Sequence, residues 1–260
     1  MDLQVKNTKV HFTSTGKGTA IVLLHGFLEN SSMWNDIAKV LSKKHRIICI
    51  DLLGHGKTEN HGYIHTMEDH ANIVKSVLNK LKLRKYIVIG HSMGGYVALA
   101  LANQFPKNIK GLCLMNSSAL PDTEEKKTNR ERAIKAVKQD YKKVVRIAIP
   151  MLFSEYNRSI FVSEIQQITK EALQISAQSI IASQEGMKIR KNHTSIYKTA
   201  NSPIQLIIGK QDPALDYKPL IEQTKNTNVQ VIEFPDGHMS HIENKEDLLI
   251  ALSSFIKICN

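Results

Sequence analysis

The sequence has few cysteines and no long apolar run. None of its apolar stretches approaches the roughly 18 residues of a membrane-spanning helix, so we expect no insertion into a membrane. The first residues alternate like a β-strand and lack the apolar segment of a signal peptide, which predicts a cytoplasmic protein. Three cysteines cannot form a disulfide framework: Cys49 and Cys113 lie in apolar runs and are expected in the core, and Cys259, close to the last residue, is expected to fray.

Acidic residues are in the minority. The 35 Lys and Arg residues exceed the 24 Asp and Glu residues, which gives a net charge of +11. More than half of this excess lies between residues 121 and 200, and no nucleic-acid-binding motif accompanies it. We therefore expect a solvated, lysine-rich helical surface, with neither nucleic acid nor a membrane as a partner. The alternative, association with a polyanion through this charge, predicts binding that weakens steeply with salt.

Apolar runs of strand length alternate with helical patterns along most of the chain. The runs are near-continuous in Val, Ile and Leu, which is typical of parallel strands covered by helices on both faces. The expected strands are residues 20–25, 46–51, 86–91, 109–116, 203–209 and 228–234, after an antiparallel edge ribbon at 3–13. The expected helices are residues 34–41, 67–81, 94–104, 217–223 and 245–258. This alternation predicts an α/β fold with a mostly parallel, doubly wound sheet.

The alternation stops between residues 119 and 200. This segment contains no convincing strand, and its apolar residues recur at helical spacing. Because the alternation resumes at residue 203, we predict about three helices inserted between two core strands. The predicted core comprises residues 1–118 and 201–260, and the predicted helical lid comprises residues 119–200. Ligands bind at the carboxyl ends of the strands in such sheets, and a lid placed there would cover the site.

The strongest motif is Gly90-His91-Ser92-Met93-Gly94-Gly95, which follows an apolar run and precedes a helical pattern. A G-x-S-x-G sequence at a strand-to-helix turn is a nucleophile elbow. The serine has a strained backbone there, so the residues two positions away must be small. The turn exposes the serine hydroxyl at the carboxyl end of the strand. We therefore predict that Ser92 is a catalytic nucleophile.

A serine hydroxyl needs a base, and the base needs a carboxylate to orient it. Asp212 and His238 each follow an apolar run, so both should lie at the carboxyl end of a strand. The order Ser, Asp, His along the chain is the one expected for this type of site. We predict that Asp212 orients His238 and that His238 accepts the proton of Ser92. Weaker candidates for the acid and the base stand nearby in the sequence: Asp216, Asp236 and His241.

Backbone amides can stabilise the oxyanion that forms when a serine attacks a carbonyl. The amide of Met93 directly follows the nucleophile at the start of a helix, and the amide of Phe27 lies in the loop after an early strand. We predict that these two amides form the oxyanion hole. His25 and Asp51 also follow apolar runs, and we expect them to shape loops rather than to react.

Taken in order, these segments resemble the α/β-hydrolase superfamily in its small, lid-bearing form. The matching segments are HGF at 25–27, DLLGHGKT at 51–58, GHSMGG at 90–95, GKQD at 209–212 and GHMSHIE at 237–243, and the resemblance spans residues 20–258. It implies the same triad and oxyanion amides, and a structural role for Glu243. The serine at the elbow distinguishes the chain from dehalogenase and epoxide-hydrolase relatives, which have aspartate there.

Motifs for a cofactor or a metal are missing. The chain has neither a G-x-G-x-x-G fingerprint nor a phosphate loop, so we expect no cofactor. His61, His65 and His70 lie close together in the sequence, but Gly62 argues against one helix face that presents them. No carboxylate–histidine pattern fixes a ligand geometry, and we expect no metal site.

We expect a serine hydrolase that cleaves small to medium carboxylic esters through an acyl-enzyme, with a small-molecule ester as its partner. Phe153, Tyr156 and Phe161 are predicted to line the substrate site from the lid, although packing between lid and core explains these residues equally well. The sequence does not determine the oligomeric state.

Two alternatives stay open at this point. Some relatives use the same triad to cleave C–C bonds or to eliminate from anionic ring substrates, and the GHSMGG region also resembles the menaquinone-pathway lyase of this fold. The basic lid residues that could then hold a substrate carboxylate are Arg130, Arg132, Arg146 and Arg158. The second alternative is a ligand-binding relative without turnover, and the complete triad argues against it.

Overall fold

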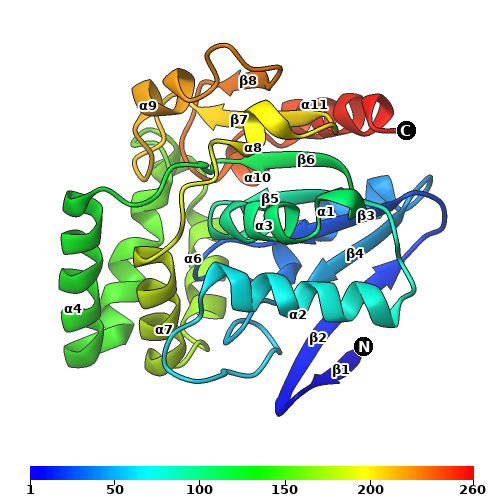
Figure 1. The fold of residues 1–260 in the computed structure, drawn as a ribbon. Helices are drawn as coiled ribbons and strands as arrows, with labels where there is room; N and C mark the ends of the chain where they lie inside the picture. Colours follow the sequence, from blue (N-terminus) through cyan, green and yellow to red (C-terminus); the bar gives the residue numbers. More distant parts are fainter.

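An eight-stranded sheet runs through the computed structural model, which describes residues 1–260, in the order β1-β2-β4-β3-β5-β6-β7-β8 (Figure 1). The strands are β1 (Asp2–Val5), β2 (Thr8–Thr15), β3 (Ala20–Leu24), β4 (Arg46–Ile50), β5 (Tyr86–His91), β6 (Ile109–Met115), β7 (Ile204–Gly209) and β8 (Gln230–Phe234). Strands β3 to β8 pair in parallel, whereas β2 is antiparallel to both β1 and β4. The predicted α/β fold with a mostly parallel sheet is confirmed.

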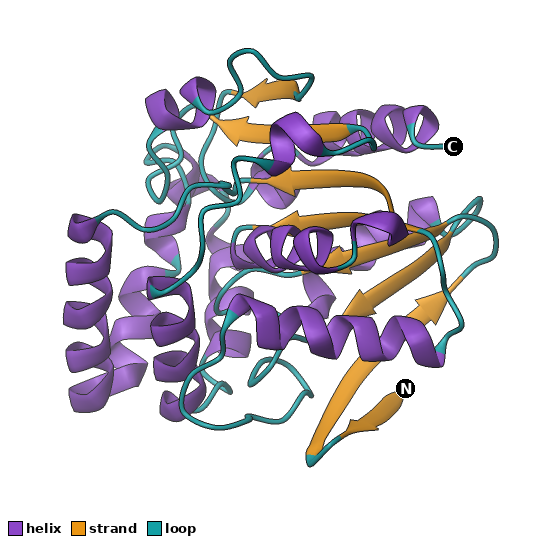
Figure 2. Ribbon diagram, in the orientation of Figure 1, coloured by secondary structure: helices purple, strands orange, loops and turns teal.

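Helices cover both faces of this sheet (Figure 2). In β3, Val22 and Leu24 pack with residues of α2 (Met67–Lys80) and α3 (Met93–Gln104) on one face. Ile21 and Leu23 pack on the other face with residues of η1 (Ser31–Trp34), α1 (Asn35–Leu41) and α11 (Lys245–Ile258). Successive side chains of a strand point to opposite faces, so a strand covered on both sides has to be apolar throughout.

The first and last elements of the chain pack against this core. The segment predicted as an edge ribbon forms the β1–β2 hairpin, which turns at Lys6 with a φ of 51°. Cys259 is buried next to Gly111 and Phe255 at the end of α11, so the expectation that it frays is wrong. The contact could not be foreseen from the sequence, because Gly111 belongs to β6, a segment far from Cys259 along the chain.

Six helical elements lie between β6 and β7. They are α4 (Glu124–Ala148), η3 (Pro150–Leu152), α5 (Asn157–Ile160), α6 (Val162–Ala172), α7 (Ala177–Lys188) and α8 (Ile196–Thr199). Figure 1 shows α4, α6 and α7 beside the carboxyl ends of the central strands. Ile196 and Tyr197 of α8 instead pack in the core cluster with α3. That residues 119–200 act as a lid stays a prediction.

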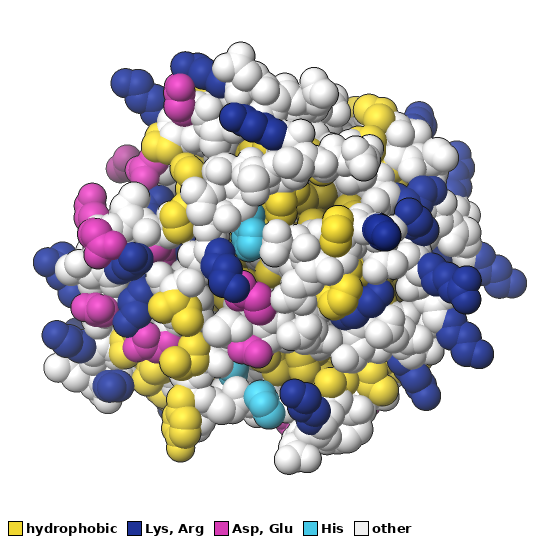
Figure 3. All heavy atoms as spheres, viewed as in Figure 1, with side chains coloured by type: hydrophobic (Ala, Val, Ile, Leu, Met, Phe, Trp, Pro, Cys, Tyr) yellow, Lys and Arg dark blue, Asp and Glu magenta, His cyan; other side chains and the backbone are white.

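The remaining helices are short: η2 (Pro106–Asn108), α9 (Tyr217–Glu222) and α10 (Ser240–Glu243). No helix has both the length and the apolarity required to cross a bilayer. Figure 3 shows Lys and Arg side chains spread over both sides of the visible face.

Candidate active site

Ser92 stands at the turn between β5 and α3. Its φ of 49° lies in the left-handed region, which is strained for a residue with a side chain. The Ser92 amide donates a hydrogen bond to the carbonyl of Met115, the last residue of β6, at 2.9 Å. A Cβ on Gly90 would collide with the carbonyl of Gly94, and one on Gly94 would collide with the carbonyl of Leu24. Both glycines are therefore required by the close approach of backbone at this turn.

Asp212 and His238 are in direct contact. Asp212 follows β7, His238 follows β8, and Oδ2 of the acid lies 2.7 Å from Nδ1 of the imidazole, with both residues buried. Burial raises the pKa of Asp212, but the adjacent imidazole and the hydrogen bonds to the carboxylate outweigh it and hold this pKa below its ordinary value. The ionised carboxylate keeps the imidazole proton on Nδ1, which leaves the lone pair of Nε2 free to accept a proton.

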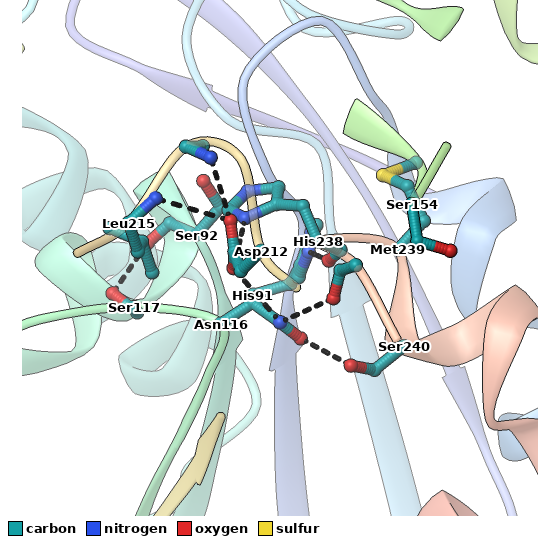
Figure 4. Close-up of polar contacts among 12 residues, drawn as sticks. His91, Ser92, Asn116, Ser117, Ser154, Asp212, Leu215, His238, Met239 and Ser240 are labelled. Atoms are coloured by element: carbon teal, nitrogen blue, oxygen red, sulfur yellow. Dashed lines mark hydrogen bonds and ion pairs between the residues drawn. The ribbon is translucent and has the colours of Figure 1, made fainter. Parts of the chain in front are cut away.

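The structure brings three of the predicted site residues together. Ser92, Asp212 and His238 gather at the carboxyl edge of the sheet (Figure 4). The rival acids do not reach the imidazole: Asp216 is exposed and pairs with Lys126, and the carboxylate of Asp236 accepts a hydrogen bond from the side chain of Asn244.

The two predicted oxyanion amides belong to adjacent segments. The Phe27 N–H donates to no acceptor within the chain. Met93 is the first residue of α3, and the first N–H groups of a helix have no acceptor inside the helix. Because Gly94 has no side chain, the start of α3 lies against the carbonyls of Leu24 and His25, which places the two loops next to each other.

His25 and Asp51 bind backbone groups. Nδ1 of His25 donates to the carbonyl of Gly26 at 2.7 Å, and Nε2 accepts from the amide of Leu52 at 2.9 Å. The carboxylate of Asp51 accepts from the amides of Ser31 and Lys57, each at 2.8 Å. His25 and Asp51 therefore stabilise the backbone of the loops around them, as expected from the sequence.

Asn116 is a site residue that the sequence analysis did not identify. It directly follows β6, with a φ of 46°, and its side-chain amide donates to Oδ2 of Asp212 and to the carbonyl of Gly237, each at 3.1 Å. Its Oδ1 accepts from the hydroxyl of Ser240 at 2.7 Å (Figure 4). Asn116 thus joins the acid to the loop that carries His238. The sequence feature that could have identified Asn116 is a polar residue at the end of an apolar strand, the same feature that identified Asp212.

A second buried group lies beside the triad. Glu29 Oε2 is 2.7 Å from Nδ1 of His91, and Glu29 Oε1 is 3.6 Å from Nε2 of His241. Ligand atoms of these three residues all lie within 4.8 Å of one another, so they could hold a metal ion. His61, His65 and His70 do not bring three ligand atoms together in this way. From the sequence, His241 was only a weaker candidate for the base, and Glu29, a single acid in the loop after β3, was not identified.

Burial and neighbouring charges shift the pKa values of Glu29, His91 and His241. Burial raises the pKa of Glu29, but the His91 imidazole outweighs it and lowers this pKa to about 2. Burial alone would lower the pKa of His91, and the Glu29 carboxylate raises it above its ordinary value. Burial lowers the pKa of His241 to about 4, so this ring is neutral. Glu29 and His91 therefore form a buried ion pair with a neutral histidine next to it.

The inserted segment is hydrogen-bonded to the loop that carries His238. The amide of His238 donates to the carbonyl of Leu152 at 2.9 Å. Oε1 of Glu243 accepts from the amide of Ser154 and from the side chain of Asn157, both at 2.9 Å, and Oε2 accepts from the amide of Met239 at 3.0 Å. Glu243 therefore ties the insertion to the histidine loop.

The three predicted substrate-binding residues occupy different environments. Phe153 is completely buried, and its ring centroid lies 6.2 Å from that of Phe161. Tyr156 is 76% exposed. Phe161 lines a cavity of about 560 Å³ between η1, α1 and α6, whose wall contains neither Ser92 nor His238. Their contact with a substrate stays a prediction.

The arginines considered for an anionic substrate lie on or under the insertion surface. Arg130 is paired with Asp122, Arg132 and Arg146 are exposed, and Nε of Arg158 lies 3.4 Å from the carbonyl of Phe153. Arg190, which the sequence analysis did not single out, also pairs with Asp122 and stacks over Tyr96 at 4.1 Å.

Known proteins share this architecture. The profile of the alpha/beta hydrolase fold matches residues 19–245. The chain belongs to the α/β-hydrolase family. A thermophilic esterase from Thermogutta terrifontis has the same fold, with a TM-score of 0.90, 26% identity and complete coverage of both chains. The enol-lactonase from Burkholderia xenovorans LB400 gives a TM-score of 0.90 at 21% identity, over 99% of this chain and 100% of that one, and so shows the fold alone.

Similarity to a curated protein covers part of this α/β-hydrolase. An uncharacterized protein of Mycobacterium tuberculosis is 34% identical over 109 residues, which are 42% of this chain and 32% of that protein. The chain thus spans about a third of the length of this relative. Together with the esterase structure, membership of the family supports a hydrolase.

Proposed function

We propose that this α/β-hydrolase is a serine hydrolase that cleaves small to medium carboxylic esters through an acyl-enzyme. One observation carries the proposal: the 2.7 Å hydrogen bond between His238 and a buried, ionised Asp212, next to a serine at a strained strand-to-helix turn. The likeness over the full length to an esterase from Thermogutta terrifontis supports an ester as the substrate class.

The first half of the proposed reaction forms the acyl-enzyme. Oγ of Ser92 attacks the ester carbonyl while Nε2 of His238 takes its proton. The amides of Phe27 and Met93 donate to the oxyanion of the tetrahedral intermediate. The C–O bond to the alcohol then breaks, and His238 returns the proton to the leaving alcohol.

The second half releases the acid. A water molecule attacks the acyl carbon, and His238 removes its proton as it did that of Ser92. Collapse of the second intermediate breaks the bond to Oγ of Ser92, which takes the proton back. Asp212 stays ionised throughout and stabilises the imidazolium that forms in each half.

The insertion would set the size of the substrate. Its residues Leu152 and Ser154 are hydrogen-bonded to the histidine loop, so the acyl group has to fit beside this segment. Phe153, Tyr156 and Phe161 are the proposed contacts. Of the arginines considered for an anionic substrate, Arg130 is already paired with Asp122 and is not free to bind a substrate carboxylate.

A panel of p-nitrophenyl esters of increasing chain length tests the function. We expect the wild type to hydrolyse short esters and the Ser92→Ala variant to lose this activity, while Ser117→Ala, an adjacent hydroxyl whose Oγ donates to the Ser92 carbonyl at 2.8 Å, retains most of it. A folded wild type that neither turns over an ester nor reacts with a fluorophosphonate would refute the proposal. Labelling of Ser92 without ester turnover would favour the C–C hydrolase or lyase alternative.

A further inference from the structure

Both ring nitrogens of His91 face hydrogen-bond acceptors. Nδ1 lies 2.7 Å from the Glu29 carboxylate, and Nε2 lies 2.9 Å from the carbonyl of His238. A carboxylate and a carbonyl oxygen can only accept, so each nitrogen must carry a proton to make its bond. The geometry therefore describes an imidazolium between a carboxylate and the backbone of the proposed catalytic base.

The same carboxylate also holds the proposed oxyanion loop. Oε2 of Glu29 accepts from the amide of Gly26 at 2.8 Å, and Gly26 directly precedes Phe27. His91 directly precedes Ser92. A continuous chain of hydrogen bonds, which we term the Glu29–His91 link, thus joins the three loops that carry the oxyanion donor, the nucleophile and the base.

The Glu29–His91 link is enclosed by protein. The side chain of Glu29 is 3% exposed and that of His91 is 1% exposed. The other titratable groups that face it are His241 of α10, Glu171 of α6, His25 directly after β3, and the Asp212–His238 pair. The ring centroids of His91 and His238 lie 5.0 Å apart. Separation of the two groups would leave an uncompensated charge in a buried site, which is energetically costly. The pair therefore stays in its observed geometry.

We propose that Glu29 is a positioning residue of the active site: through His91 it fixes the carbonyl of His238, and through the amide of Gly26 it fixes the loop of Phe27. This inference rests on the proposed serine-hydrolase function. Reaction rates depend steeply on such placement, and a shift of about 1 Å can cost roughly a hundredfold. Glu29 itself touches no reacting atom and acts only through these two contacts.

Glu29→Gln tests the proposal, because glutamine has the same shape and can still accept from Gly26 but carries no charge. We expect kcat for a short p-nitrophenyl ester to fall roughly ten- to a hundredfold, with KM changed less than about threefold. Glu171→Gln is the matched control: this carboxylate accepts from Asn30 and Ser32 next to the same loop but does not contact His91. We expect its kcat to stay within about twofold of the wild type.

A second variant separates the link from general packing. His91→Gln keeps a donor toward the His238 carbonyl and removes the charge, so it should lower kcat by a similar factor. If Glu29 acts through His91, the double variant falls little further than the more impaired single variant. Independent, multiplicative losses would overturn the proposal, and so would a folded Glu29→Gln protein with wild-type kcat.

A readout without turnover distinguishes this inference from the proposed function. In nitrogen-15 NMR of Ser92→Ala protein near pH 7, we expect both ring nitrogens of His91 to be protonated, and one to lose its proton in the added Glu29→Gln background. A neutral His91 with Glu29 intact would overturn the link, as would one tightly bound equivalent of Zn²⁺, since Glu29, His91 and His241 would then be metal ligands. An intact imidazolium in a wild type that neither hydrolyses esters nor labels at Ser92 would instead refute the proposed function.

Discussion

Nδ1 of His238 lies 2.7 Å from Oδ2 of Asp212, although the two residues are 26 positions apart in the sequence. The contact exists because β7 and β8 are adjacent and parallel, so the loops that follow them leave the sheet at the same edge. Asp212 is anchored there by more than the imidazole, since its Oδ1 accepts from the amides of Ala214 and Leu215 at 2.8 and 3.2 Å. A rigid carboxylate gives a rigid orientation to the ring that it holds.

Asp212→Asn should abolish most of the proposed activity. An amide can donate to Nδ1 and so favours the wrong tautomer, with the proton on Nε2, and in a well-studied serine protease this change lowers kcat by about 10⁴. We expect a loss on the order of 10³–10⁴ in kcat for p-nitrophenyl esters. Asp216→Asn, which removes the exposed rival carboxylate, should leave kcat within about twofold of the wild type. Equal losses in the two variants would show that Asp212 does not orient the base.

The sequence predicted the parts of the site that depend on position along a strand. Ser92, Asp212 and His238 each follow an apolar run, and in a parallel sheet the ends of such runs converge. The predicted boundaries of the central strands agree with the structure to within two residues. This succeeded because strands buried on both faces need continuous apolar sequence, which few other local structures produce.

The parts that the sequence did not predict depend on partners from distant segments. Glu29 is meaningful only because His91 and the Gly26 amide surround it, and a single acidic residue in a loop carries no pattern of its own. In the sequence, Asn116 is likewise only a polar residue at the end of a strand, and its role depends on its hydrogen bonds to Asp212 and Gly237. The exposure of Tyr156 and the burial of Phe153 depend on how a few residues between η3 and α5 turn, which periodicity cannot specify over so short a length.

Asn116→Ala should weaken both the fold and the site. The substitution leaves the Gly237 carbonyl and the Ser240 hydroxyl without their partner, and a buried polar group that loses its hydrogen bond costs about 1–3 kcal/mol. It also removes a donor from Asp212, whose pKa should rise toward its ordinary value. We expect urea denaturation to show this loss of stability, together with lower kcat.

Asn226→Ala provides the comparison for Asn116→Ala, because Asn226 also has a positive φ, of 56°, but is exposed in the turn between α9 and β8. In this variant the free energy of unfolding should fall only because alanine is less favourable than asparagine at a positive φ, and kcat should stay unchanged. If both variants behaved alike, the contacts of Asn116 would have no specific effect on the site.

Asp122→Asn should destabilise the base of the insertion. Asp122 is completely buried and pairs with both Arg130 and Arg190, so its neutralisation leaves two guanidinium groups without their counter-charge. Removal of one partner from a buried ion pair typically costs about 3–5 kcal/mol. Glu124→Gln, which breaks an exposed pair with Lys127, should cost at most about 1 kcal/mol. Chemical denaturation of the two variants measures the contrast, and similar small losses would show that the Asp122 pair does not hold the segment.

The Glu29–His91 link predicts a specific dependence of stability on pH. The pKa of Glu29 is lowered from 4.5 to about 2, so its stabilisation is complete above about pH 4.5 and is lost as the pH falls toward 2. The pKa of His91 is raised above 6.5, so its stabilisation is complete below about pH 6.5 and is lost as the pH rises through the folded-state pKa. The pair therefore stabilises the fold fully between these two limits.

The comparison of wild type with Glu29→Gln isolates this effect, because every other titrating group is common to both proteins. We expect the wild type to have the larger free energy of unfolding between about pH 4.5 and 6.5, and the difference to shrink above that range as His91 loses its proton beside a buried carboxylate. Urea denaturation at several pH values measures both curves. A difference that stays constant from about pH 6 to pH 9 would mean that His91 does not carry the charge that its two acceptors require.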